Sequence, residues 1–391
     1  MKTRKRAASL AILFLTPVLV LAGRSKQPVP ASQHYIAYIG SYTTKTESKG
    51  IYSFHFDTAT GKMTGIELAG ASKDPSWVVV DPSGQYLYAA NEMGEGSTVS
   101  AYSIEPKSGK LTLLNSLPAL GKDPCHLSFD RTGKFLLVAN YSSGNVAVFP
   151  IGADGKLGKH TALVSDAGKT GPNEKRQDGP HAHWVGASES GHLVYVADLG
   201  LDRVMIYKFD AANGTLAPSA EPDKPPKAAE FKPGTGPRHI AFSKNRKFMY
   251  ALGELESTLT VFASGAPDKF TPIQSLPMLP AGFAGRNDAA EIELHPSGKF
   301  LYASNRGHDS VAVYSVDQLK GTLTQVEDVP TLGKEPRHIA IDPGGHFLLV
   351  ENQNTNSIVE FRIDQATGKL TATGETLATP SPICIAFLPV E

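Results

Sequence analysis

The chain repeats one strand-rich segment seven times, and this periodicity restricts its possible folds more than any other feature. Each segment begins with an apolar strand, continues through a turn such as that at 81–84, and ends its second strand in a pattern like Ala-Asn. A third strand then reads Val-x-Val-Tyr. Repeats of roughly 40–50 residues with about four strands are typical of a β-propeller. The segments start at Asp74, Asp123, Gly179, Gly236, Asp288, Glu335 and Ser381, at spacings of 49, 56, 57, 52, 47 and 46 residues.

Six of the segments begin whole units, and the two ends of the chain are complementary halves of the seventh. The last segment, 381–387, supplies only a first strand, whereas 35–40, 50–56 and 63–68 read as second, third and fourth strands. Pairing the last strand with the first ones leaves neither end as an open edge. The sequence therefore predicts an all-β, seven-bladed β-propeller closed by the C-terminal strand joining the N-terminal strands.

The repeat also predicts the domain organisation. Residues 35–391 form one propeller domain, because the repeat resumes in phase after the stretches 168–178 and 218–237, which we interpret as surface loops. Residues 1–22 have a basic start, an apolar run and a small-residue cleavage site, as a signal peptide does. Residues 23–34 are predicted to be a flexible linker. Cleavage would place the mature protein in the periplasm or outside the cell, without a membrane span; an uncleaved anchor is the alternative.

The charge balance and the cysteine content limit the classes of function that the chain can have. The chain has 38 basic and 38 acidic residues; removing 1–22 takes away four basic ones and leaves a net charge of about −4. This balance gives no electrostatic reason to bind nucleic acid. The only cysteines, Cys125 and Cys384, are predicted to be buried thiols, since neighbouring strand residues face opposite sides. No Cys/His spacing resembles a zinc site, and we expect a monomer.

Two rings of variable side chains are predicted at one end of the propeller. The start of the first strand and the end of the second lie at the same end of an antiparallel pair. The neighbouring core positions repeat Val, Leu and Ile, whereas these positions vary. Charges that converge in a cavity are costly to desolvate and are usually paired or functional. The first ring is Ser76, Cys125, His181, Arg238, Ala290, Arg337 and Ile383; the second is Glu92, Tyr141, Leu199, Glu254, Arg306 and Gln353, with Ser41 or Tyr42.

The residue types at this end suit a small anionic substrate. Guanidinium groups bind carboxylate or phosphate and stabilise an oxyanion, and Glu or His can act as a general base. Each candidate also has a purely structural interpretation, as an ion-pair partner or a loop residue. The recurrent His126, His239 and His338 are interpreted as making structural hydrogen bonds inside each blade. His181 and His183, two residues apart, lack an evident third metal ligand.

At these residues the chain resembles the lactonase family of seven-bladed propellers, which includes the propeller-type 6-phosphogluconolactonases and the carboxy-muconate lactonizing enzymes. The matching motifs are Gly-Pro-His181, Gly-Pro-Arg238-His, Gly-Glu254-Leu and Ser-Asn-Arg306. The resemblance covers residues 35–389. It implies that His181, Arg238, Glu254 and Arg306 are catalytic, and it implies no metal or organic cofactor. We assign His183, Arg337 and Gln353 to substrate binding.

Three functions remain open at this point. The leading hypothesis is hydrolysis of a sugar-acid lactone, 6-phosphogluconolactone or a relative, with Glu254 or His181 activating water. The second is a muconate-type cycloisomerase that uses the same arginines. The third is a non-catalytic, exported binding propeller, because the strand pattern also resembles surface propellers with Tyr-Val-Thr-Asn repeats.

Overall fold

The structure is a computed structural model that describes residues 34–219 and 227–390. The predicted signal peptide, 1–22, lies outside these residues, as does the predicted linker apart from His34, which begins the first strand. Within the described residues, no helix has the length and apolar character needed to cross a membrane.

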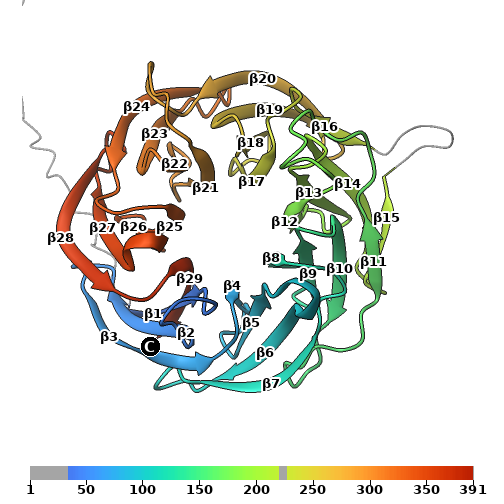
Figure 1. Ribbon diagram of the computed structural model, residues 1–391, viewed down its shortest axis with the longest axis vertical. Helices are drawn as coiled ribbons and strands as arrows, with labels where there is room; N and C mark the ends of the chain where they lie inside the picture. The colour runs from blue at the N-terminus through green and yellow to red at the C-terminus, as the bar shows by residue number, and fades with distance from the viewer. Residues whose placement is uncertain (1–33, 220–226, 391) are drawn as a thin grey trace, which may run out of the picture. The chain divides into compact units, whose positions relative to one another are not determined.

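Seven antiparallel sheets follow one another around a central channel (Figure 1). We number the blades from the sheet that begins at Pro75. Consecutive strands of each blade run from the channel outwards, as the repeat predicted. The innermost strands are β4 (Pro75–Val80), β8 (Pro124–Phe129), β12 (Ala182–Ala187), β17 (Pro237–Phe242), β21 (Asp288–Leu294), β25 (Pro336–Ile341) and β29 (Pro382–Val390).

The other strands complete the blades. The second strands are β5 (Tyr86–Asn91), β9 (Phe135–Asn140), β13 (Leu193–Asp198), β18 (Phe248–Gly253), β22 (Phe300–Arg306), β26 (Phe347–Asn352) and β1 (His34–Ser41). The third are β6 (Thr98–Ile104), β10 (Asn145–Pro150), β14 (Arg203–Asp210), β19 (Thr258–Ala266), β23 (Ser310–Val316), β27 (Ser357–Ile363) and β2 (Gly50–Asp57). The fourth are β7 (Leu111–Pro118), β11 (Ala162–Ser165), β15 (Thr215–Pro218), β20 (Lys269–Pro277), β24 (Leu323–Pro330), β28 (Leu370–Ala378) and β3 (Met63–Ala71). Single 3₁₀ turns are η1 (Gly94–Gly96) and η2 (Gln353–Thr355).

The predicted closure of the ring is confirmed. The seventh blade has the order β29-β1-β2-β3, so the last strand of the chain pairs with the first. The register runs from His34 opposite Val390 to Ser41 opposite Pro382. Seven apolar clusters fill the spaces between neighbouring blades, one cluster per interface. Cys125 and Cys384 are buried free thiols, as predicted.

The tight turns between first and second strands explain why the repeat is so regular. In blade 1 the Asp81 carboxylate accepts from the backbone N–H groups of Ser83, Gln85 and Tyr86 at 2.7–3.0 Å. Gly84 closes the turn with a φ of 71°, in the left-handed region that glycine adopts at no steric cost. Asp130 and Asp342 hold the turns of two other blades in the same way.

One of the two expected surface loops contains regular structure. Within the stretch 218–237, β16 (Ala228–Glu230) adds to the outer edge of β14 beside β15. Residues 220–226 of this stretch lie outside the described part of the chain. A strand of three residues has too few positions for an alternating pattern, and for this reason the sequence did not reveal it.

Candidate functional site

Glu254 lies at the centre of a buried cluster of charges where the inner strands begin, which we call the channel mouth. It follows β18 directly, and only 3% of its surface is exposed. Its Oε2 lies 3.1 Å from Nε of Arg238 and 3.2 Å from Nη2 of Arg306, while its Oε1 pairs with Arg176. Three guanidinium groups from separate parts of the chain therefore meet on one carboxylate.

The beginning of β21 holds two of these arginines in place. Nη1 of Arg238 donates to the carbonyl of Ala290 at 2.5 Å. Arg306 donates from Nε to the carbonyl of Asp288 at 3.2 Å and from Nη2 to that of Ala289 at 3.3 Å. A bulge interrupts the pairing of β21 with β22 at this point. Bulges are a common way of redirecting backbone and side chains next to functional sites.

The charges in the mouth keep Glu254 ionised. Burial by itself would raise the pKa of Glu254, but Arg306, Arg238 and Arg176 outweigh it and hold that pKa at about 2. Burial, together with the nearby Arg306, lowers the pKa of Arg238 to about 10. Both groups are thus charged at neutral pH. A carboxylate with so low a pKa and three partners is a weak proton acceptor.

His181 lies against the ring of Tyr141 in a stacked arrangement, with ring centroids 4.7 Å apart. Its Nδ1 lies 3.1 Å from the Tyr141 carbonyl oxygen, which can only accept, so Nδ1 carries a proton. Its Nε2 lies 2.9 Å from Oδ1 of Asp178, whose side chain is largely exposed. The backbone N–H of His181 donates to Asp198 at 2.9 Å, which fixes the position of the ring.

Arg337 lies in a second part of the same mouth. Its Nη2 donates to the hydroxyl of Tyr42 at 3.0 Å, and that hydroxyl donates to Glu92 at 2.8 Å. Burial raises the pKa of the Cys125 thiol, and Glu92, Arg238, Arg337 and Glu254 all act on it electrostatically. Both groups of charges therefore act on the same buried thiol.

The structure shifts the predicted alignment of blade 3 by two residues. Ala182 lies opposite Asp198, just as Pro237 lies opposite Gly253 in blade 4. His183, and not His181, consequently occupies the position of Arg238, and Trp184 that of His239. Placing His181 in the first ring was wrong, because the Gly-Pro motif comes two residues earlier in blade 3 than in blade 4.

His183 and Gln353, which the sequence also assigned to substrate binding, lie in the first and second rings respectively. His183 is buried, with its ring 5.1 Å from that of His239 and its Nδ1 3.8 Å from the Cys125 sulfur. Burial, together with Arg238, lowers its pKa well below the usual value, so it is neutral. Gln353 begins η2, and its backbone N–H donates to Glu335, as that of Glu254 does to Gly236. This places Gln353 in the second ring, as predicted, with Tyr42 and not Ser41 as the member from blade 7.

The recurrent histidines form a central ring of side chains across the channel, beyond the mouth. The prediction of hydrogen bonds inside each blade is wrong for two of them. Only His338 contacts a residue of its own blade, Glu351. His239 contacts Glu291 of the next blade at 2.8 Å, and His126 accepts from a backbone N–H of blade 3. The central ring comprises Trp77, His126, Trp184, His239, Glu291, His338 and Cys384.

Arg176 belongs to the site but was missed from the sequence. It lies in the stretch 168–178, which we interpreted as a surface loop, and contacts Glu254, Asp288 and the Tyr141 hydroxyl. About 34% of its side chain is exposed. The stretch has no counterpart in other blades, so alignment of the repeats could not point to it. The described residues contain no group of three or more potential metal ligands.

Comparison with known proteins now adds an independent observation. The sequence matches the family described as Lactonase, 7-bladed beta-propeller over residues 36–387. The chain belongs to this family. It is 38% identical over 355 residues to the 6-phosphogluconolactonase of Bacillus subtilis, covering 90% of this chain and 98% of that protein. A 6-phosphogluconolactonase of Formosa agariphila is 33% identical over 313 residues, which is 78% of this chain and 85% of that protein.

A solved structure is similar over almost the whole chain. The periplasmic gluconolactonase of Pseudomonas aeruginosa is 32% identical and superposes with a TM-score of 0.85. The match covers 92% of this chain and all of that chain. Since the similarity extends over the whole propeller, it includes every blade that contributes to the mouth.

Proposed function

We propose that this chain hydrolyses the lactone of a sugar acid at the channel mouth. The observation that carries the proposal is the meeting of Arg176, Arg238 and Arg306 on the buried Glu254, beside a histidine with a fixed ring. The names of the lactonase relatives support this class of reaction. A phosphorylated or carboxylated sugar lactone fits a mouth rich in guanidinium groups.

Two arginines keep donors for the reacting carbonyl. A guanidinium has five N–H groups. In the described part of the chain, Nη1 of Arg306 and Nη2 of Arg238 make no hydrogen bond, so they are available to a developing oxyanion. Arg337 and Arg176 are less buried, and we assign them to the anionic group of the substrate. Fixed donors stabilise an oxyanion without reorganising during the reaction.

His181 is the better candidate for the general base. Both oxygens of Glu254 are occupied by guanidinium groups, and its pKa of about 2 leaves little tendency to take a proton. The Nδ1 proton of His181 is held by the Tyr141 carbonyl, so in the neutral imidazole the lone pair is on Nε2. Asp178, whose largely exposed carboxylate lies 2.9 Å from Nε2, has to turn towards solvent for water to reach this nitrogen. We therefore assign proton transfer to His181 and positioning of the arginines to Glu254.

The reaction proceeds in two steps. Nε2 of His181 takes a proton from water as the water oxygen bonds to the lactone carbonyl carbon, and the carbonyl oxygen becomes an oxyanion facing Arg306 and Arg238. When the tetrahedral intermediate collapses, the bond from the carbonyl carbon to the ring oxygen breaks. The proton on His181 passes to that oxygen, giving the open hydroxy acid and the neutral imidazole.

Hydrolysis of 6-phosphogluconolactone and of glucono-1,5-lactone by the purified chain tests the proposal. We expect His181→Gln to lower kcat by about 100-fold, because general-base catalysis typically contributes at least that much. Arg337→Gln should raise KM more for the phosphorylated lactone than for the neutral one. Arg131→Gln, which removes an exposed ion pair with Glu189, is the matched control and should not change either constant. Full activity of the His181 variant would contradict the assignment of the base.

Export is a separate part of the proposal. The basic and apolar start of residues 1–22 supports it, and one similar structure is that of a periplasmic protein. N-terminal sequencing of the protein from a periplasmic extract should give a start just after Ala22. Recovery of the intact N-terminus in the cytoplasmic fraction would contradict export.

A further inference from the structure

A cavity occupies the channel on the other side of the central ring from the charged mouth. Its volume is about 560 Å³, within the range of small-molecule sites. It is lined by the later parts of the inner strands, among them 78–80, 127–129, 292–294 and 385–387. Successive strand residues advance about 3.3 Å, which carries these positions away from the mouth. None of the arginines that contact Glu254 lines this cavity.

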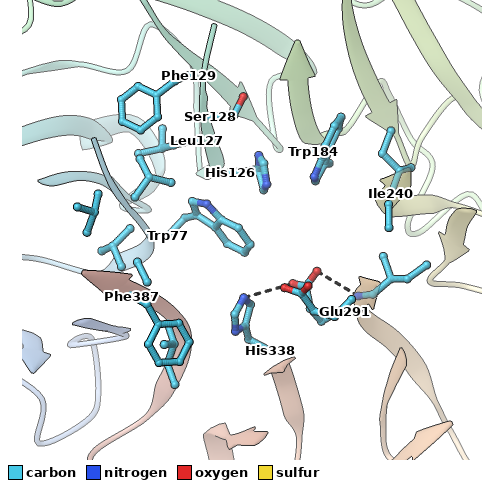
Figure 2. Close-up of a pocket in the computed structure, with 18 of the residues that line it drawn as sticks. Trp77, His126, Leu127, Ser128, Phe129, Trp184, Ile240, Glu291, His338 and Phe387 are labelled. Atoms are coloured by element: carbon cyan, nitrogen blue, oxygen red, sulfur yellow. Dashed lines mark hydrogen bonds and ion pairs between the residues drawn. The ribbon is translucent and has the colours of Figure 1, made fainter. Parts of the chain in front are cut away.

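One wall of this cavity is aromatic. Trp77 and Trp184, the only tryptophans in the sequence, both line it. The ring of His126 lies between them, with centroids 4.4 Å from Trp77 and 5.4 Å from Trp184, and Figure 2 shows the three side by side. Tryptophan faces attract cations more strongly than other aromatic rings do.

The opposite wall carries two glutamates from β21. Glu291 accepts from Nδ1 of His239 at 2.8 Å, and Figure 2 shows it reaching towards His338. Burial would raise the pKa of Glu291, but His239 and His338 hold it at about 2, so it is ionised. Glu293 makes no hydrogen bond or ion pair within the described part of the chain, and no lysine or arginine lines the cavity.

Two other glutamates act on Glu293 and share one cationic partner, and burial raises the pKa of one of them, Glu351. His338 is that partner and lies 3.7 Å from Glu291 and 2.5 Å from Glu351. Two carboxylates thus share a single imidazolium. Burial lowers the pKa of His239 to about 4 and that of His126 well below its usual value, so both rings are neutral at pH 7.

We propose that this cavity binds a small organic cation, with an alkylammonium group held against the aromatic wall by the Glu293 carboxylate. Aromatic faces, carboxylates and the lack of lysine and arginine in the lining all favour a cation there. The two ends of the channel would then take ligands of opposite charge. The inference is independent of the lactonase assignment, which concerns the mouth.

The affinity should rise with pH. Burial, with Glu291 and Glu351, raises the pKa of Glu293 to about 8, and His338 opposes this. Glu293 is therefore mostly protonated at pH 6.5 and mostly ionised at pH 8.5. A bound cation stabilises the ionised form, so binding should be tighter at the higher pH.

Fluorescence of the two tryptophans reports directly on this cavity. Tetramethylammonium chloride is titrated into the full-length purified protein, with sodium chloride replaced to keep ionic strength constant. tert-Butanol, neutral and of similar size, and glucose are titrated in parallel. We expect a saturable change with tetramethylammonium alone, and an affinity about tenfold higher at pH 8.5 than at 6.5, which corresponds to one added charge interaction of about 1.4 kcal/mol.

Two variants separate this site from the mouth. Glu293→Gln keeps the shape of the side chain and should weaken binding about tenfold at pH 8.5. It should also remove most of the rise with pH, leaving the smaller part that comes from loss of the His338 charge. Arg337→Gln alters only the mouth and should bind as the unaltered protein does. No saturable response, an equal response to tert-butanol or glucose, or an unchanged pH dependence in the Glu293 variant would each overturn the proposal.

Discussion

At the scale of single residues, Glu254 is the carboxylate that balances the buried positive charges of the channel mouth. Replacing it by Gln would leave Arg238 and Arg306 buried beside Arg176 without a counter-charge. Breaking a buried ion pair on one side typically costs about 3–5 kcal/mol. We therefore expect Glu254→Gln to lower the free energy of unfolding by about that much, measured by urea denaturation, and to reduce lactone hydrolysis as well.

An exposed pair provides the control for this prediction. Glu95 pairs with Lys122 at 2.5 Å, but 83% of the Glu95 side chain is exposed. Surface pairs contribute about 0–1 kcal/mol because solvent screens them. Glu95→Gln should thus leave the unfolding midpoint nearly unchanged. Equal effects of the two substitutions would mean that Glu254 does not bind the arginines as described.

His338 makes stability depend on pH in a definable window. Burial alone would lower the pKa of His338, but Glu351 and Glu291 raise it to about 9, above the value of about 6.5 in an unfolded chain. The contribution of this group is fully present below pH 6.5 and is lost as pH rises through 9. It amounts to about 3 kcal/mol. Urea denaturation at pH 6, 7.5 and 9 measures it, and an NMR titration midpoint near 6.5 for the His338 ring would refute it.

The positions of site residues could be predicted from the sequence where the residue belonged to the repeat. The positions of Arg238, Glu254 and Arg306 relative to the strand ends predicted that all three lie at one end of the channel. In the structure, both guanidinium groups lie within 3.2 Å of the Glu254 carboxylate. His181 was placed in the wrong ring because a proline was used as the marker. Which strand residues oppose one another depends on bulges, and these have no fixed sequence signature.

At the scale of elements, the segment between β11 and β12 positions part of the mouth. Its Gln177 is buried; the side-chain amide donates to the Leu199 carbonyl at 2.9 Å and accepts from the N–H of Asn173 at 3.1 Å. Gln177→Ala removes both contacts and frees the neighbouring Arg176. We expect kcat/KM for lactone hydrolysis to fall by about tenfold, while the global unfolding midpoint shifts by about 1 kcal/mol or less.

Gln274 is the matched control for Gln177. It also bonds both backbone groups of a neighbouring segment, donating to the carbonyl of Leu323 at 2.9 Å and accepting from its N–H at 2.7 Å. It lies in β20, an outer strand away from the mouth. Gln274→Ala should cost similar stability but leave kcat/KM unchanged. If both variants lose activity equally, the effect of Gln177 is general destabilisation and not positioning.

The strands were predictable as elements, whereas the insertions between blades were not. Apolar strands recur in every unit and Asp-centred turns in three of them, so several independent copies reinforce each assignment. The stretch that carries Arg176 and the short β16 each occur once. A segment without a counterpart has only its own local pattern, and neither Gly/Pro content nor charge revealed that these segments contact the propeller.

At the scale of the whole molecule, the channel separates two environments of opposite charge. The central ring of Trp77, His126, His239 and His338 lies between the arginine-rich mouth and the glutamate-lined cavity, with ring centroids of 4.4–5.3 Å between neighbours. Each inner strand contributes to both ends within six to nine residues. The repeat thus places two sites on the same inner strands, and part of the cavity lining, such as Val78, Leu127 and Ile292, also belongs to the apolar core between the blades.

The closure of the ring is the contact on which the whole molecule depends. β29 pairs with β1 along its length, and its buried Cys384 and Leu388 pack towards blade 1 while Ile385 packs towards blade 6. A chain ending at Ser381 would expose the edge of β1 and open two apolar interfaces. We expect it to lose cooperative thermal unfolding, measured by circular dichroism, and to aggregate on size-exclusion chromatography. Removing 1–32 instead should leave both properties intact; a truncated chain that unfolds cooperatively at the original midpoint would show that the blades are stable without closure.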